Sequence, residues 1–365
     1  MTQNMNTSFE AYWRAVASGT RKRIPDRLLV LCLIPFSLIY AIIQYTRAEF
    51  YRSGIFTTKR LPRPVISIGN ITVGGTGKTP VTAYIARFLM ARGLSVAVLS
   101  RGYGGTLEGS ASIVSDGSTV LLEPEQCGDE PFLLARTNPG LMVVIGADRY
   151  EAGMLAINQL SPDIFILDDG FQHLRLHRDL DVLLLDYRYP YGNGWTLPAG
   201  LLREPKSAIG RTDMVLYTRC PEIPRSPLAV PGKLVCYARH HLCAVRPFAE
   251  DVWLPLSVLQ GRTFLAFAGI AEPQYFFDGL SALGLNIVAT ISFPDHAAYA
   301  EFQIAEIISA IQSSGADGVI TTEKDGVKLR HLPRSLSEKI LFARLELALD
   351  DPSTLAAALL NLLQK

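Results

Sequence analysis

The stretch "VISIGNITVGGTGKTPVTAYIARFLMARG", residues 65–93, decides the fold. Its apolar start predicts a buried strand, and a glycine-rich turn follows. Residues 79–92 predict a helix with one apolar face, and residues 94–100 predict the next strand. This strand–turn–helix–strand order is the βαβ unit in which phosphate-binding loops occur. We therefore expect an α/β fold, with a mostly parallel sheet like that of P-loop NTPases.

The turn carries the groups that bind a nucleotide's phosphate chain. The strict pattern GxxxxGK[ST] requires glycine five residues before Gly77, where this chain has Thr72. That departure leaves the backbone N–H groups, the Lys78 ammonium and the Thr79 hydroxyl in place, and these suit phosphates and Mg²⁺. The predicted nucleotide-binding loop consists of Thr72, Val73, Gly74, Gly75, Thr76, Gly77, Lys78 and Thr79.

Acidic residues end two further apolar runs. "DIFILDD", residues 163–169, predicts a buried strand that ends in Asp168 and Asp169, and "DVLLLDYR", residues 181–188, predicts another. Strand ends at the carboxyl edge of a parallel sheet face the phosphates and their metal. Side chains alternate along a strand, so both acids face the metal only if the strand ends there, and Gly170 permits that turn. The alternative for either acid is a solvated loop position.

Composition narrows the classes of partner. The chain has 365 residues and a net charge of +1, so no overall field attracts nucleic acid. Its five cysteines include no CxxC pair, which argues against a zinc site or a disulfide framework. We expect no nucleic-acid partner and a reducing compartment.

An uncharged apolar segment, residues 28–46, lies near the N-terminus. As a helix it would be about 28 Å long, close to the thickness of a bilayer core of about 30 Å. Basic residues flank both ends, which suits two ends held at the same anionic surface. We expect a membrane-associated helix that either spans the bilayer or lies in one leaflet. The alternative is an ordinary buried core helix.

Three regions follow from these patterns. Residues 1–60 are expected to form the membrane-associated segment, and residues 61–255 the P-loop domain. Prolines are frequent and periodicity is weak between about 207 and 260, which indicates a domain transition. Residues 256–365 alternate predicted strands and helices again, so we expect a second, smaller α/β domain there.

Two candidate residues remain ambiguous on spacing alone. Asp129 begins a predicted helix, where capping is the simplest role for an acid. His296 follows a proline and an aspartate, as a turn residue would.

Motifs along the chain resemble one family. In order they are "GNITVGGTGKTP", "SRGYGG", "GDEP", "GADR", "DDGFQH", "LPAGLLREP", "FPDH" and "TTEKD". Together with the apolar helix, they resemble the tetraacyldisaccharide 4'-kinase (lipid A 4'-kinase) family. The resemblance extends from about residue 20 to residue 330. The family's loop departs from the strict pattern in the same way as Thr72.

The resemblance implies a reaction and a place. ATP, with Mg²⁺, would donate its γ-phosphate to the 4'-hydroxyl of a tetraacyl glucosamine disaccharide 1-phosphate, giving lipid IVA. The enzyme would bind the lipid substrate at the cytoplasmic face of the inner membrane of a Gram-negative bacterium.

The resemblance also implies residue roles. Asp129 and His296 would pair as the base that accepts the hydroxyl proton, and Lys78 would act on the phosphates. Thr79, Asp168 and Asp169 would hold or position the metal, with help from Glu204. Substrate or phosphate contacts are expected from Tyr103, Arg149 and Arg203.

Two other functions fit parts of the sequence. A membrane-associated regulatory P-loop ATPase without a lipid acceptor would use the loop and the apolar helix. It would not require the distant His296. A GTPase switch has less support, because no NKxD guanine-specificity motif occurs. "TEKD", residues 322–325, has Glu where that motif needs Asn or Thr.

Overall fold

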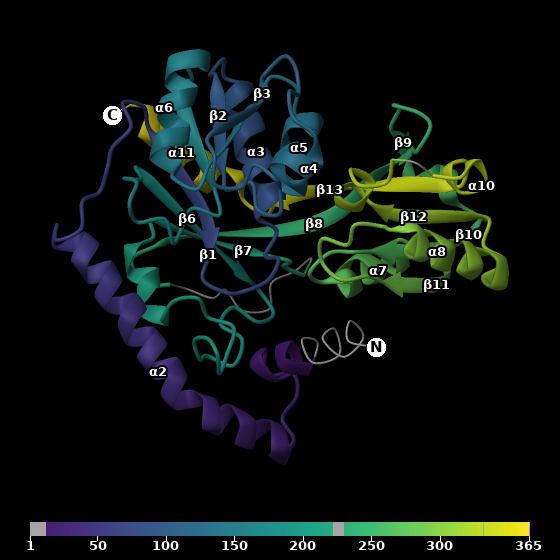
Figure 1. Ribbon diagram of the computed structural model, residues 1–365, viewed down its shortest axis with the longest axis horizontal. Coiled ribbons are helices and arrows are strands. Elements are labelled where there is room, and N and C mark those ends of the chain that lie inside the picture. The colour runs from purple at the N-terminus through teal and green to yellow at the C-terminus, as the bar shows by residue number, and fades with distance from the viewer. Residues whose placement is uncertain (1–11, 222–229, 331, 365) are drawn as a thin grey trace.

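The computed structural model describes residues 12–221, 230–330 and 332–364 of the chain. Residues 1–11 of the predicted membrane-associated segment therefore lie outside the described part. The described strands form one 13-stranded sheet that runs through both parts of the molecule (Figure 1). Its order is β11-β10-β12-β13-β8-β7-β6-β1-β5-β2-β4-β3, with β9 pairing on β8.

The first part of the sheet is centred on the strand before the glycine-rich loop. β1 (Val65–Asn70) pairs in parallel with both β5 (Ile164–Asp168) and β6 (Leu180–Asp186). Beyond these lie β2 (Val96–Ser100), β4 (Met142–Ile145), β3 (Ser112–Asp116) and β7 (Met214–Thr218). Only β3 runs antiparallel to its neighbour among these strands. The predicted α/β class with a mostly parallel sheet is confirmed.

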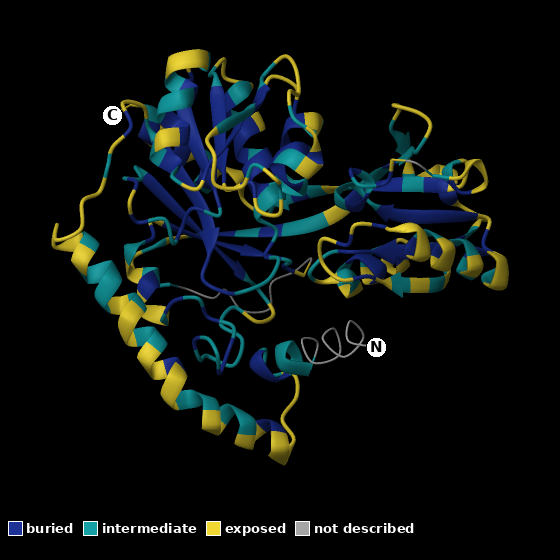
Figure 2. Cartoon of the chain, viewed as in Figure 1, coloured by how far each residue is buried: buried dark blue, intermediate teal, exposed yellow. Residues whose placement is uncertain are grey.

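Helices cover both faces of this first part, so its strands are buried apolar runs. One core cluster contains side chains of α3 (Lys78–Met90), α5 (Asp129–Thr137) and the C-terminal α11 (Pro352–Leu363). The other contains side chains of α6 (Arg149–Leu160). Figure 2 shows the buried strands between exposed outer helix faces. The carboxyl ends of β1 and β5 thus open at the edge of a well-packed layer.

The second part repeats this layering on a smaller scale. Its strands are β10 (Thr263–Ala268), β11 (Asn286–Ser292), β12 (Gly318–Thr322) and β13 (Ile340–Leu349). Separate core clusters lie under α7 (Pro273–Ala282) and under α8 (Glu301–Ser314). Short elements complete the chain: α4 (Pro124–Cys127), η1 (Lys206–Arg211), β9 (Leu254–Pro255), η2 (Leu256–Leu259), α9 (Glu323–Gly326) and α10 (Arg334–Ser337).

One long strand, β8 (Leu234–Pro247), connects the two parts. Its first residues pair in parallel with β7, and its later ones pair antiparallel with β13. The chain then returns along β13, and α11 packs on the first core. We retain the boundary at residue 255 as a proposal, with the addition that α11 packs with the first part.

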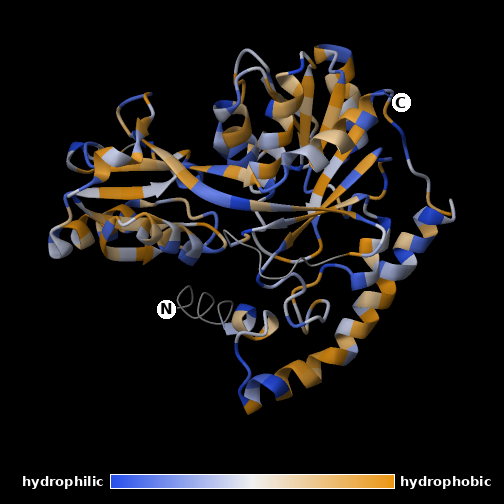
Figure 3. Ribbon diagram, turned by 180° about the vertical axis from the view of Figure 1, so that it is seen from behind, coloured by the Kyte–Doolittle hydropathy of each residue, from blue (hydrophilic) through white to orange (hydrophobic). Residues whose placement is uncertain are grey.

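The apolar N-terminal segment is a single helix, α2 (Ile24–Arg52), longer than the uncharged stretch that predicted it. Pro35 lies inside it without ending it. Many of its apolar side chains are exposed. Figure 3 shows hydrophobic residues along the length of this helix. Within the described residues it is the one helix long and apolar enough to cross a membrane.

Candidate functional site

The glycine-rich loop joins β1 to α3 with two glycines in the left-handed region. Gly74 has a φ of 118° and Gly77 a φ of 80°, which side chains with a Cβ rarely adopt. Thr72, where the strict pattern has glycine, is buried and forms an isolated antiparallel bridge with Leu202. An extended residue in a bridge needs no glycine, which explains the departure.

The predicted lysine lies over the end of β1. The Nζ of Lys78 is 3.4 Å from the Oδ1 of Asn70 and 3.6 Å from the Oδ1 of Asp169. Thr79 follows it in the first turn of α3, where backbone N–H groups are free to bind an anion. The loop therefore presents an ammonium, a hydroxyl and a helix N-terminus together.

The two acids after β5 have separate environments. Asp168 is almost fully buried and accepts a hydrogen bond of 3.2 Å from the hydroxyl of Thr82. Burial, with Glu130 nearby, raises the pKa of Asp168 to about 7, although Lys78 opposes this. The backbone of Asp169 is in the left-handed region, with a φ of 54°, so it does not continue the strand. β5 therefore ends at Asp168. This was the condition for both acids to face the same site, because side chains alternate along a strand.

Asp169 is held by two cations. Arg203 donates to both of its carboxylate oxygens, at 3.0 and 2.9 Å. Burial raises the pKa of Asp169, but Lys78 and Arg203 outweigh it and lower the value to about 2. Arg203 also donates to the Oδ1 of Asn70, so this arginine links the end of β1 to Asp169, directly after β5.

The donor set fits a magnesium ion that is bound together with a nucleotide. A buried carboxylate with a raised pKa gains from a neighbouring divalent cation, and Asp168 and Thr79 supply the oxygen ligands that Mg²⁺ prefers. Among the described residues no three acidic, histidine or cysteine side chains cluster as a metal site. Phosphate oxygens would therefore have to complete the coordination, as in other nucleotide sites.

Glu204 and Arg149 lie deeper than the sequence suggested. Both oxygens of Glu204 accept hydrogen bonds of 2.7 Å from Arg211, and the glutamate is almost fully buried. That pairing favours a structural role, and the predicted metal contact of Glu204 stays a prediction. Arg149 donates to the carbonyl of Gly146, while its buried Nε has no partner. Burial lowers the pKa of Arg149 to about 10, so it remains charged at neutral pH.

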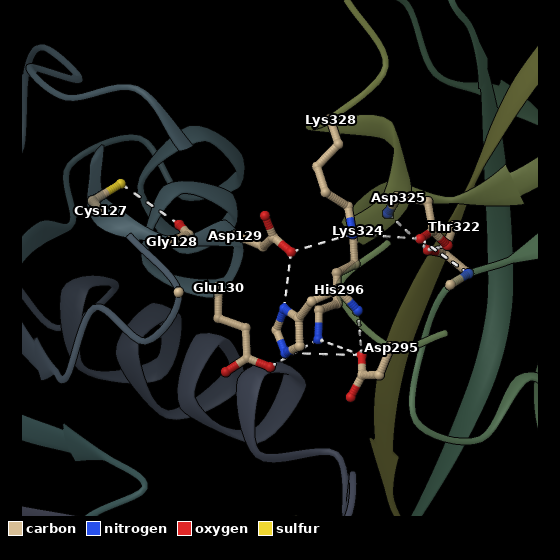
Figure 4. A network of polar contacts seen from close by, with 12 residues as sticks. Cys127, Gly128, Asp129, Glu130, Asp295, His296, Thr322, Lys324, Asp325 and Lys328 are labelled. Atoms are coloured by element: carbon tan, nitrogen blue, oxygen red, sulfur yellow. Dashed lines mark hydrogen bonds and ion pairs between the residues drawn. The ribbon is translucent and has the colours of Figure 1, made fainter. Parts of the chain in front are cut away.

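The second group of residues lies between the two parts of the molecule, as Figure 4 shows. Asp129 begins α5, and His296 comes from the loop after β11. The Oδ2 of Asp129 is 3.0 Å from the Nδ1 of His296 and 3.3 Å from the Nζ of Lys328. Burial raises the pKa of Asp129, but the bond to His296 and the charge of Lys328 outweigh it and hold the pKa below its ordinary value.

Backbone geometry explains the glycine before Asp129. Gly128 has a φ of 87°, and a Cβ there would lie 2.5 Å from the carbonyl oxygen of Tyr103. His296 is also left-handed, with a φ of 61°, an uncommon conformation that is often found at functional sites. The ring of Tyr103 lies 5.9 Å from the ring of His296. The structure therefore brings Tyr103, Asp129 and His296 together.

Sequence reasoning assigned no role to two lysines beside this pair. Lys324 lies 3.0 Å from Glu130 and 3.4 Å from Asp295, so it links α5 to the loop that carries His296. Lys328 contacts Asp129 directly. The motif "TTEKD" was the available signal for Lys324, but nothing in its spacing indicated the partner.

Comparison with known proteins gives a consistent result. The family model for tetraacyldisaccharide-1-P 4'-kinase matches residues 29–364. A tetraacyldisaccharide 4'-kinase of Pelobacter propionicus is 61% identical over 361 residues, covering 99% of this chain and 100% of that protein. One of Geobacter sulfurreducens is 52% identical, covering 96% of this chain and 99% of that protein.

A solved structure agrees in fold. The "apo" form of LpxK from Aquifex aeolicus in complex with ATP is similar with a TM-score of 0.78 and 35% sequence identity. The match covers 92% of this chain and 99% of that one.

Proposed function

Because the chain belongs to the tetraacyldisaccharide-1-P 4'-kinase family, we propose that the two residue groups described above form one site for phosphoryl transfer from ATP to a lipid. The acceptor is the 4'-hydroxyl of a tetraacyl disaccharide 1-phosphate. The observation that carries the assignment is the contact between Asp129 and His296, 3.0 Å apart. Nucleotide binding alone has no need of this pair.

One electrostatic contribution supports a position of the two groups next to each other. Glu130, directly after Asp129, is close enough to Asp168 to raise its pKa. We propose that a hydroxyl bound at Asp129 faces the phosphate end of a nucleotide held by Lys78. This arrangement supports in-line transfer between the loop and α5.

Asp129 is the proposed proton acceptor. Its lowered pKa keeps it ionised at neutral pH, so it can accept a hydrogen bond from the attacking hydroxyl. A weak base suffices when the transition state is loose, because the hydroxyl becomes acidic only as it bonds to phosphorus. His296 fixes the carboxylate through Nδ1, with Lys328 on the same oxygen.

The nucleotide side supplies charge. Lys78 would contact the β- and γ-phosphates, and Arg203 and Arg149 would add positive charge at the end of β5. Mg²⁺, which Thr79 and Asp168 would hold, neutralises charge that develops on the phosphate oxygens. Asp169 positions Lys78 and Arg203 through its ion pairs. Tyr103, against His296, is placed to contact the sugar.

We also propose that α2 lies in one leaflet at the cytoplasmic face of the inner membrane. Ser37, in the middle of the helix, is fully buried and exchanges hydrogen bonds of 2.7 Å with Thr196. Near the end of α2, Arg47 donates to the carbonyl of Gln172. If α2 spanned the bilayer, the irregular loop around Thr196 would enter the hydrocarbon, which lipid-exposed loops do not do.

The decisive experiment supplies labelled ATP and the tetraacyl disaccharide 1-phosphate to the purified protein in detergent. We expect label on the lipid. Asp129→Asn, which keeps the size of the side chain, should lower the rate by about 10²-fold or more. Asp163→Asn is the matched control. Asp163 accepts a hydrogen bond from the backbone N–H of Ser95, at the opposite end of β5 from the site. Hydrolysis of ATP without labelled lipid would favour the regulatory ATPase instead.

The leaflet proposal has its own test. Cysteines replace Lys22 and Ser53, which flank α2, in a variant without the native thiols Cys32 and Cys243. An impermeant thiol reagent should label both positions from the cytoplasmic side of membrane vesicles. Labelling from opposite sides would establish a spanning helix.

A further inference from the structure

Two successive carbonyls of the glycine-rich loop accept hydrogen bonds from the last residue of β7 and from the residue that follows it. The Nη2 of Arg219 donates to the carbonyl of Gly75 at 2.5 Å. The hydroxyl of Thr218 donates to the carbonyl of Thr76 at 2.8 Å. A carbonyl that already accepts a hydrogen bond from the protein is not free to turn its negative end toward the phosphates.

Arg219 is itself fixed by three features. Its backbone is left-handed, with a φ of 58°, which turns the chain sharply after β7. Its Nη1 forms an ion pair of 2.8 Å with Asp186, at the end of β6. The guanidinium also stacks on the ring of Tyr275, 4.1 Å from the ring centroid. The side chain is only 15% exposed, so these contacts leave it little freedom.

Tyr275 gives this arrangement a second consequence. It belongs to α7, which packs in the second part of the molecule, whereas Gly75 and Asp186 belong to the first. The loop also approaches that second part directly at Gly75, since a Cβ there would lie 3.3 Å from the Cβ of Ala271. Arg219 therefore contacts the phosphate loop and the second part at once.

We propose that Arg219 is a positioning residue for the nucleotide. It holds the carbonyl of Gly75 outward so that the loop's N–H groups converge on the phosphates, and its contact with Tyr275 ties that geometry to the second part. The inference rests on the nucleotide site of the proposed function. It adds a residue that none of the sequence motifs contains.

Arg188 provides a matched control. Its guanidinium also lies over the ring of Tyr275, at 5.0 Å, and its backbone N–H donates to Asp186. Among the hydrogen bonds and ion pairs between described residues, none joins the Arg188 side chain to the loop. Replacing Arg188 with Ala removes a cation from the same neighbourhood and leaves the bond to Gly75 in place.

The test measures binding of ATP and ADP to the full-length protein by calorimetry, separately from lipid phosphorylation. For Arg219→Ala we expect both nucleotides to bind roughly 10- to 100-fold more weakly, as for the loss of a charge-assisted hydrogen bond. The KM for the lipid should stay unchanged. Arg219→Lys should restore part of the affinity, because one ammonium can reach Asp186 or Gly75 but does not reproduce the fork. Arg188→Ala should bind as the unchanged protein does.

Three results would overturn the proposal. One is unchanged nucleotide affinity in Arg219→Ala. Another is an equal loss in Arg188→Ala, which would make net charge the cause. The third is a parallel loss of nucleotide and lipid binding with a lower melting temperature, which would make Arg219 merely structural. Since nucleotide binding needs no lipid, failure of the kinase assay alone would sink the proposed function and leave this inference standing.

Discussion

The two halves of the proposed site are built in different ways. The nucleotide half, Lys78, Asp168, Asp169 and Arg203, is centred on the adjacent ends of the paired strands β1 and β5. The acceptor half, Asp129, His296 and Lys328, joins residues 167 positions apart across two core clusters. Sheet register fixes the first half, whereas side-chain contacts between the two parts fix the second. Substitutions should therefore separate nucleotide binding from acceptor chemistry.

The largest expected effect breaks the nucleotide half. Lys78→Ala removes the ammonium beside Asp169, and we expect kcat/KM to fall by about 10³-fold or more, with weaker ATP binding. Steady-state lipid phosphorylation and calorimetry measure the two quantities. Lys59→Ala is a suitable control, because that lysine pairs with Glu151 away from the loop. A rate within tenfold of the unchanged protein would remove Lys78 from the phosphate site.

The next effect breaks the acceptor half alone. His296→Ala leaves Asp129 without its imidazole partner, and we expect kcat to fall by roughly 10- to 100-fold with ATP affinity unchanged. His177→Ala is the control, since that histidine is partly exposed and faces Asp179. An equal drop in ATP affinity would show that the two halves are not separable.

These halves also differ in how far the sequence predicts them. The loop, its helix and the acids after β5 follow from local patterns, and the strands appear within a residue or two of their expected bounds. Thr72 needed the structure, because its bridge to Leu202 forms between distant segments. Asp129 and His296 looked like a cap and a turn residue, and only the family resemblance paired them. Lys328 had no signal, because its contact depends on how the second part packs against α5.

A pH profile sharpens the comparison. Lys328→Met removes one cation from the oxygen of Asp129 that also meets His296, and the pKa of the carboxyl should rise. A carboxylate base works only when ionised, so the rate of the variant should fall most at acidic pH and recover as pH increases. We expect the loss to be largest at about pH 5 and below, a few-fold or more, and to shrink toward pH 9.

The measurement is kcat/KM for the lipid across that pH range, at saturating ATP. Lys324→Met is the informative comparison, because Lys324 pairs with Glu130 and Asp295 instead. A uniform loss at every pH in Lys328→Met would show that the lysine only supports the fold. Asp169 should add no pH dependence in this range, because its pKa is about 2.

The smallest expected effect leaves both halves intact and acts on α2. Ser37→Ala removes the hydroxyl that bonds to the buried Thr196, and we expect a loss of about 1 kcal/mol in the free energy of unfolding. Ser53→Ala, at the exposed end of the helix, should cost less. Denaturant unfolding in detergent measures both. Thr196 directly precedes the "LPAGLLREP" segment that contains Arg203, and it forms a bridge with Leu202 in that segment. A less tightly held α2 should therefore affect the nucleotide half before the acceptor half. A selective rise in the KM for ATP in Ser37→Ala would show that coupling, and a change confined to His296-dependent steps would contradict it.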